Sequence, residues 1–225
     1  DGYDVVLCVD GNDENRHGPV GTGKSNLLLW TSNALAAKIR AALVYLETIN
    51  RIPQELRDLL SSETDPFRFD VSRDLVVADD YLGFAQAIER RRFGQIIWLD
   101  EAEWFFFSEW HAFKEVKRLT PEFMTNRKEG RVWLLGLPVI WKMLDFMRDS
   151  RIQWRLRMET RSIASLFMRA GAKWNQPKKD QWGIGIFRST GIPRAPLEPW
   201  NQYVGQIERH MEICPDEDRC VRALR

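Results

Sequence analysis

The hydrophobic pattern of the chain alternates between strand-like and helix-like segments. Continuous apolar runs, as in the buried strands of a parallel sheet, are separated by segments whose apolar residues recur at helical spacing. This alternation predicts an α/β fold in which helices flank a central, mostly parallel sheet. The strands expected before residue 160 are 3–10, 41–48, 75–78, 95–99, 131–138 and 151–158, the last as an edge or half-exposed strand.

Helices are expected between most of these strands. Asp80 is expected to be an N-cap, because an aspartate oxygen can accept hydrogen bonds from the free N–H groups of the first helical turn. The expected helices are 25–39, 54–61, 81–92, 115–128 and 140–147.

The pattern changes after Ser162. Residues 163–169 continue as a strand, and 173–187 are typical of a β-hairpin in which Trp174 and Trp182 form a cross-strand pair. A proline-rich arm then leads to a closing helix over 200–211. We therefore expect one domain, with a core over 1–161 and an appendage over 162–225 that packs on it.

Composition indicates an ordinary folded protein. The 225 residues are 44% hydrophobic and 29% charged, and the formal net charge is +1. This balance excludes a globally basic nucleic-acid binder but permits a local basic face. No apolar run approaches the length of a membrane span and no signal peptide opens the chain, so we expect a cytoplasmic protein without a span of its own.

A glycine-rich segment after the first strand carries the clearest chemistry. Residues 18–25 fit the phosphate-binding pattern G-x-x-x-x-G-K-[ST] at every fixed position. The glycines let backbone N–H groups point at an anion, and Lys24 is expected to contact the β- and γ-phosphates while Ser25 ligates Mg²⁺. The expected nucleotide-binding residues are Gly18, Pro19, Val20, Gly21, Thr22, Gly23, Lys24, Ser25 and Asn26.

The run 95–101 supplies the second half of this site. Its apolar residues end in Asp100 and Glu101, as in a Walker B strand, so Asp100 is expected to hold Mg²⁺ together with Ser25. Glu101 is then placed to orient or deprotonate the attacking water. The alternative for Asp100 is a helix cap, and Glu103 is expected to be a solvated or salt-bridged neighbour. Together the two motifs predict a P-loop ATPase that uses ATP and Mg²⁺.

The region after Glu101 resembles the FtsK/HerA superfamily of P-loop ATPases, and within it the compact ATPases of viruses, plasmids and integrative elements. The resemblance covers roughly 3–160 and also the proline-rich arm with Trp200 and Tyr203. The features that carry it are Asp-Glu-Ala-Glu at 100–103, a Trp/Phe segment, a charged helix ending Asn126-Arg127-Lys128, a strand into Leu137-Pro138, Asp-Phe-Met-Arg at 145–148, and Arg151.

This resemblance implies a RecA/FtsK-like ring, expected to be a hexamer, that uses ATP hydrolysis to translocate double-stranded DNA. A portal, capsid or membrane protein is expected as its docking partner, and the polar insert 12–17 is expected near the subunit boundary. The function implied is genome packaging or DNA transfer. Two other functions stay open: a P-loop small-molecule kinase, and an assembly or secretion ATPase that does not pump DNA.

The resemblance also assigns roles to single residues. Arg127 and Arg151 match arginines of the family pattern, and either is expected to act in trans as an arginine finger; the alternative for each is a surface salt bridge. The chain departs from the pattern at Leu137-Pro138, where many members have a polar sensor, so Asn126 is a candidate for that role.

Contact with DNA needs only a few basic side chains, because a translocating ring grips phosphates without reading bases. The candidates are Lys178-Lys179 at the hairpin tip and the run Arg90-Arg91-Arg92, and for each the alternative is a solvated charged face.

Overall fold

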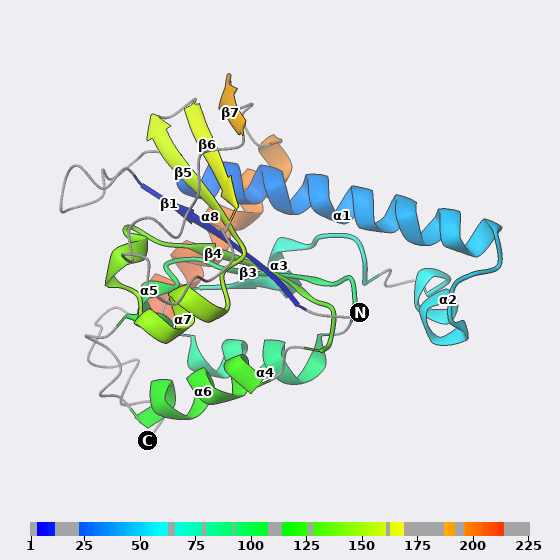
Figure 1. Ribbon diagram of the computed structural model, residues 1–225, viewed down its shortest axis with the longest axis horizontal. Coiled ribbons are helices and arrows are strands. Elements are labelled where there is room, and N and C mark those ends of the chain that lie inside the picture. The colour runs from blue at the N-terminus through cyan, green and yellow to red at the C-terminus, as the bar shows by residue number, and fades with distance from the viewer. Residues whose placement is uncertain are drawn as a thin grey trace.

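A seven-stranded sheet is the middle layer of the computed structural model, with helices on both of its faces (Figure 1). The strand order is β2-β3-β4-β1-β5-β6-β7. The strands are β1 Val5–Asp10, β2 Leu75–Val76, β3 Ile96–Leu99, β4 Val132–Gly136, β5 Trp154–Thr160, β6 Ile163–Met168 and β7 Phe187–Thr190. The structure describes residues 4–11, 23–62, 66–77, 80–91, 93–107, 114–125, 128–160, 163–168, 187–191 and 196–213.

The sheet is mostly parallel, as the sequence predicts. The strands from β2 to β5 run parallel to their neighbours, whereas β6 and β7 are antiparallel additions at one edge. The helices are α1 Lys24–Thr48, α2 Gln54–Leu60, α3 Val71–Asp74, α4 Tyr81–Arg90, α5 Glu103–Phe106, α6 Lys114–Thr125, the 3₁₀ turn η1 Ile140–Lys142, α7 Asp145–Ser150 and α8 Leu197–Ile213.

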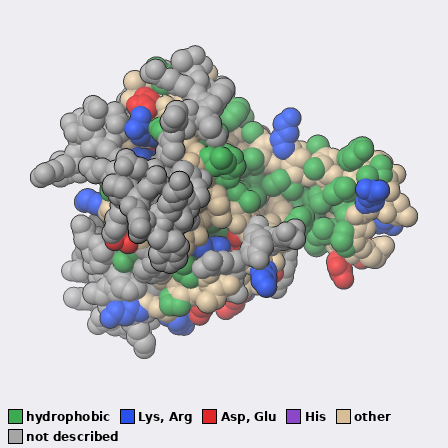
Figure 2. Space-filling view, in the orientation of Figure 1, with side chains coloured by type: hydrophobic (Ala, Val, Ile, Leu, Met, Phe, Trp, Pro, Cys, Tyr) green, Lys and Arg blue, Asp and Glu red, His purple; other side chains and the backbone are tan. Residues whose placement is uncertain are grey.

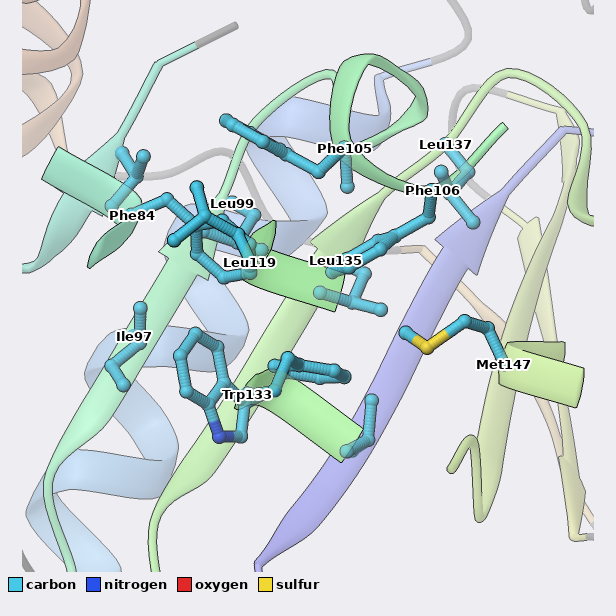
Figure 3. Close-up of a cluster of buried hydrophobic side chains, with 14 of the residues drawn as sticks. Phe84, Ile97, Leu99, Phe105, Phe106, Leu119, Trp133, Leu135, Leu137 and Met147 are labelled. Carbon is cyan, nitrogen blue, oxygen red and sulfur yellow. The ribbon is translucent and has the colours of Figure 1, made fainter. Parts of the chain in front are cut away.

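One face of the sheet is covered by α4, α5, α6 and α7. In Figure 3 the rings of Phe84, Phe106 and Trp133 lie close together over strands β3 and β4, with Leu119 of α6 beside them. Phe84 is fully buried, and its ring contacts Phe106 at 5.7 Å and Trp133 at 5.9 Å between centroids. Such aromatic contacts add specific geometry to the large apolar area that these rings bury.

The opposite face is covered by α1, α3 and α8. Leu28 of α1, Trp98 of β3 and Leu134 of β4 are fully buried there. Because both faces are covered, strand β3 is buried at every position, and this explains its uninterrupted apolar sequence.

Asp80 is the N-cap of α4, as predicted, and its carboxylate accepts a hydrogen bond from the Gly83 N–H at 2.8 Å. The strand expected over 41–48 is wrong, because these residues are the C-terminal half of α1. No glycine or proline interrupts α1, and its apolar run continues on the helix.

The end of α1 and the short α2 project away from the sheet (Figure 1). Leu43, Ile52 and Phe67 form a small separate core that joins them. Tyr45 on the outer side of α1 is 63% exposed, and hydrophobic side chains are visible along this projection in Figure 2. Helix α1 has the length and apolar composition of a membrane-spanning helix. This is weak evidence for a membrane span, because core helices of soluble proteins meet the same criteria.

Of the two alternatives expected for 151–158, the half-exposed strand is confirmed, because most positions of β5 are of intermediate exposure, and the edge position is wrong. Strand β5 lies between β1 and β6, and its Arg155 side chain is buried in an ion pair with Asp10. The sheet continues past residue 162, because β6 pairs with β5 and β7 pairs with β6. Most of the expected hairpin 173–187, including Trp174 and Trp182, lies outside the described residues.

Candidate active site

The first turn of α1 holds the described part of the phosphate-binding motif. Gly23 is the residue before the helix, and its φ of 85° lies in the left-handed region that glycine adopts without strain. Lys24, Ser25 and Asn26 follow at the N-terminal end of α1, where the helix dipole favours an anion. The residues Gly18, Pro19, Val20, Gly21 and Thr22 and the insert 12–17 lie outside the described part of the chain.

Asp100 lies at the carboxyl end of β3, and hydrogen bonds fix the chain around it. The Asp100 N–H donates to the Val76 carbonyl of β2 at 3.0 Å, and the Ala102 N–H donates to the Gly136 carbonyl of β4 at 2.8 Å. The Asp100 side chain itself is directed inward, and the residue is only 6% exposed.

Gly136 makes the close approach of α1 and Asp100 possible. A Cβ atom at this position would lie 2.9 Å from the Leu28 side chain and 3.2 Å from an Asp100 carboxylate oxygen. Because β4 lies between β1 and β3, its carboxyl end separates the two halves of the candidate site. A residue without a side chain at the end of β4 leaves space for them to meet.

Ser25 and Asp100 meet through a third side chain, Tyr203 of α8. Its hydroxyl oxygen lies 2.7 Å from Asp100 Oδ2 and 3.1 Å from Ser25 Oγ. An ionised carboxylate only accepts hydrogen bonds, so Tyr203 donates to Asp100 and accepts from the Ser25 hydroxyl. The Tyr203 ring stacks on Trp98, with 5.0 Å between centroids, and also contacts Trp200.

The electrostatics of Asp100 are those of a carboxylate without a cationic partner. Burial is the main reason that its pKa rises to about 6; nearby Glu101 raises it further, whereas the Tyr203 hydrogen bond and Lys24 act in the opposite direction. No lysine or arginine of the described residues forms an ion pair with it. Burial also raises the pKa of Tyr203, so its hydroxyl keeps its proton.

Glu101, the predicted water-activating residue, is exposed immediately after Asp100. Its φ is 50°, a left-handed conformation that is unusual for a residue with a side chain. Such strain costs on the order of 1 kcal/mol or more and is common at active sites. The turn directs the chain from β3 into α5 and leaves the Glu101 side chain at the surface.

Glu103 is not the solvated or salt-bridged neighbour that the sequence predicts, because the described residues offer it no ion pair. It lies in the first turn of α5, and its Oε2 atom is buried without a hydrogen-bond partner. Burial raises its pKa to about 8, with smaller contributions from Glu101 and Asp100. Near neutral pH this carboxyl group, unlike that of Asp100, therefore favours its neutral form.

Arg151 lies away from these groups, at the amino end of β1. It is 2% exposed, its guanidinium lies 3.4 Å from Asp4 Oδ2, and it stacks over the Phe123 ring at 4.6 Å. This position supports an ion pair within the chain and not an arginine finger for Arg151. The predicted ion pair was on the surface, whereas the observed one is buried. Arg127 and Asn126 lie outside the described residues.

The candidate DNA-contacting residues are only partly described. Arg91 pairs with the buried Asp74 at 3.2 Å, which ties it to the protein, whereas Arg90 is exposed at the end of α4. Arg92, Lys178 and Lys179 lie outside the described residues.

Two contributors to the site were missed in the sequence. Gly136 follows an apolar strand, and only the tertiary approach of Leu28 and Asp100 explains it. Tyr203 belongs to a segment included in the family resemblance, but no local pattern indicated that its hydroxyl reaches Ser25.

The residues present fit a magnesium ion. Mg²⁺ prefers oxygen ligands, and it is usually held by one or two protein groups together with phosphates and waters. The Ser25 hydroxyl and the Asp100 carboxylate are such groups, and the buried carboxylate forms no ion pair with a described residue, although Lys24 is close enough to lower its pKa. No cluster of three or more His, Cys, Asp or Glu side chains in the described ranges suits a metal, so a site built only from protein ligands is not supported there.

Compared with known proteins, the chain matches no family model, no curated protein and no solved structure. The resemblance to the FtsK/HerA superfamily therefore stays a prediction from the sequence.

Proposed function

We propose that this chain is an ATPase that hydrolyses Mg²⁺-bound ATP. The observation that carries the proposal is the meeting of Ser25 and Asp100, which lie 75 positions apart in the sequence and share one hydrogen-bond partner, Tyr203. Ser25 lies in the first turn of helix α1, and Asp100 directly follows the buried strand β3. This pairing is the one expected of the metal-binding side chains in a P-loop ATPase.

Each residue of the site has a role in this proposal. Lys24 and the N-terminal N–H groups of α1 bind the phosphates, and Ser25 and Asp100 hold the metal. When bound, Mg²⁺ supplies positive charge to the phosphate oxygens. Glu101 accepts a proton from the water that attacks the γ-phosphorus, and the bond to the β,γ-bridging oxygen breaks to release ADP and phosphate.

The proposed work of this ATPase is the translocation of double-stranded DNA by a ring of subunits. This part rests on the sequence resemblance. The exposed Glu101 is compatible with it, because a neighbouring subunit can complete a site that reaches the surface. Arg127 stays the candidate for the arginine finger, since Arg151 is buried against Asp4.

The test is steady-state ATP turnover with and without double-stranded DNA, together with the oligomer mass by light scattering. Glu101→Gln should reduce turnover by about 10²–10⁴-fold, because it removes the proton acceptor but keeps the shape of the side chain. It should leave nucleotide binding intact, whereas Lys24→Ala should abolish binding. An exposed glutamate of α8 offers a matched control, and Glu208→Gln should leave turnover unchanged.

The outcomes separate the three functions. Turnover that duplex DNA stimulates, in a protein that assembles into rings, supports the translocase. A monomer that transfers the γ-phosphoryl group to a metabolite supports the kinase, and hydrolysis that ignores DNA supports an assembly ATPase. Full turnover in Glu101→Gln would contradict the role of this residue.

A further inference from the structure

Helix α8 places an aromatic side chain in the middle of the candidate magnesium site. Its Tyr203 hydroxyl bonds Asp100 at 2.7 Å and Ser25 at 3.1 Å, and Trp98 and Trp200 pack against its ring. The helix itself packs against α1 and α3. The position of the hydroxyl is therefore set by a helix and two tryptophans.

The distances put the Tyr203 oxygen where a ligand of the metal belongs. Mg²⁺ binds oxygen atoms at about 2.1 Å in octahedral geometry, so two adjacent ligands of one ion lie roughly 3 Å apart. The Tyr203 oxygen lies 3.1 Å from Ser25 Oγ, which is the separation expected of a neighbouring ligand. It also donates a hydrogen bond to Asp100, as a metal-bound water would.

Tyr203 is nevertheless a poor substitute for that water. Its hydroxyl is neutral, whereas Mg²⁺ prefers carboxylates, phosphates and waters and keeps several waters when it binds proteins. Asp100 is 6% exposed while Tyr203 is in place, which leaves little room for a hydrated ion. The hydroxyl of Tyr203 therefore occupies the position that a water of the hydrated metal would need beside Ser25 and Asp100.

We propose that Tyr203 closes the magnesium site, and that binding of the Mg²⁺–nucleotide withdraws its hydroxyl and loosens α8 from the core. This inference rests on the proposed nucleotide site. The Tyr203 hydroxyl forms hydrogen bonds with Ser25 and Asp100 and thereby competes with the metal for them. The C-terminal helix thereby responds to the state of the nucleotide site.

The first experiment is a titration of Mg²⁺ into the protein with a fluorescent ATP analogue, before any turnover is measured. Tyr203→Phe keeps the ring on Trp98 and removes only the competing hydroxyl. Two hydrogen bonds are lost from the closed state. The Mg²⁺ concentration at half-saturation should therefore fall by a factor of about five or more. In EDTA the variant and the parent should bind the analogue alike.

Tyr45→Phe is the matched control, because Tyr45 is 63% exposed near the far end of α1. This variant should require the same Mg²⁺ concentration as the parent. A higher Mg²⁺ requirement in Tyr203→Phe would overturn the proposal, since it would show that the hydroxyl helps to hold the metal. An unchanged requirement would overturn it as well.

The second experiment measures amide hydrogen exchange in α8, a readout that does not depend on turnover. In the parent, exchange over Trp200–Ile207 should become faster when Mg²⁺ and a non-hydrolysable ATP analogue are added together. Slower or unchanged exchange would contradict the withdrawal of the helix.

The two proposals fail in different ways. If the parent binds the analogue and Lys24→Ala does not, the nucleotide site stands, and only the behaviour of Tyr203→Phe decides the role of Tyr203. If neither the parent nor any variant binds the analogue at any Mg²⁺ concentration, both proposals are refuted.

Discussion

Asp4 and Asp100 are buried aspartates at opposite ends of the sheet, and their surroundings differ in charge. Asp4 precedes β1 and lies between two arginines: Arg131 Nη2 is 2.9 Å and Arg151 Nη2 is 3.4 Å from its Oδ2 atom. It also accepts hydrogen bonds from the Arg131 backbone N–H and from Trp133 Nε1. Asp100 has a neutral hydroxyl, that of Tyr203, in the corresponding place.

This difference separates a carboxylate with a structural role from one for which we propose a functional role. The Asp4 charge is paired with buried arginines inside the fold. These contacts fix the amino end of β1 against β4 and against the residues before β5. The Asp100 charge has no ion pair among the described residues, so burial raises its pKa to about 6. A buried carboxylate without an ion pair is suited to bind a cation, and this supports the proposed metal site at the carboxyl end of the sheet.

The largest change in stability is expected from a substitution at Asp4, whose charge is paired with arginines. Asp4→Asn removes the buried carboxylate with which Arg131 and Arg151 pair, and breaking such a buried pair lowers the free energy of unfolding by about 3–5 kcal/mol. Urea denaturation at pH 7 measures this loss. Asp58→Asn in the exposed α2 is the matched control, with a change of less than about 0.5 kcal/mol. A loss below about 1 kcal/mol for Asp4→Asn would show that the cluster tolerates an unbalanced charge.

Asp100→Asn, in contrast, is expected to increase the free energy of unfolding near neutral pH. Its pKa is raised in the folded protein from 3.8 to about 6, so the parent loses stability as the pH rises through this window. The asparagine variant does not titrate, so above pH 6 it should be more stable than the parent by at most ~3 kcal/mol. Below the usual aspartate pKa the difference should vanish.

Urea titrations at pH 4, 6 and 8 measure this dependence. The same variant should require far more Mg²⁺ to bind nucleotide, because the carboxylate is gone. An Asp100→Asn protein that is less stable than the parent at pH 8 would contradict the account of Asp100 as an unbalanced charge.

Glu103→Gln is expected to increase the free energy of unfolding as well, by a smaller amount. Burial raises the pKa of Glu103 from 4.5 to about 8, so the parent loses stability between these values and the loss is constant above them. Since Glu103 is partly exposed, we expect the glutamine variant to gain on the order of 2 kcal/mol at pH 8. Thermal unfolding over pH 5–9 measures the gain, and Glu208→Gln on α8 should show no such trend. A gain that does not depend on pH would exclude titration of Glu103 as its cause.

The parts of the fold that local chemistry determines were predictable. Strand β3 is apolar at every position because both faces of the sheet are covered, and Asp100 follows it directly. The cap at Asp80 is a local hydrogen bond to Gly83, so the sequence contains all the information that it needs.

The segment 41–48 was not predictable in the same way. A short apolar run is typical of a buried strand and of a helix alike, and only its neighbours decide between them. Here Leu43 packs against Ile52 and Phe67 beyond the end of α1, and this contact lies outside the run itself. Strand β5 was misplaced for a related reason, because its Arg155 is buried by a partner, Asp10, far away in the sequence.

The role of Tyr203 depends on contacts over the longest distances. It lies 178 positions from Ser25 and 103 from Asp100, and no periodicity or motif spacing connects such residues. The sequence predicts Ser25 and Asp100 as a metal-binding pair because each member belongs to a local motif. It could not identify the side chain between them, since that contact exists only after α8 has packed on the sheet.

The unbroken length of α1 has a mechanical consequence. Its 25 residues span about 37 Å, from the turn that holds Lys24 and Ser25 to the projecting end near α2. A helix of this length that tilts by about 5° around its first turn moves its far end by about 3 Å. Helix α1 therefore has the dimensions of a lever, with its fulcrum beside the proposed phosphate site and its far end projecting beyond the sheet.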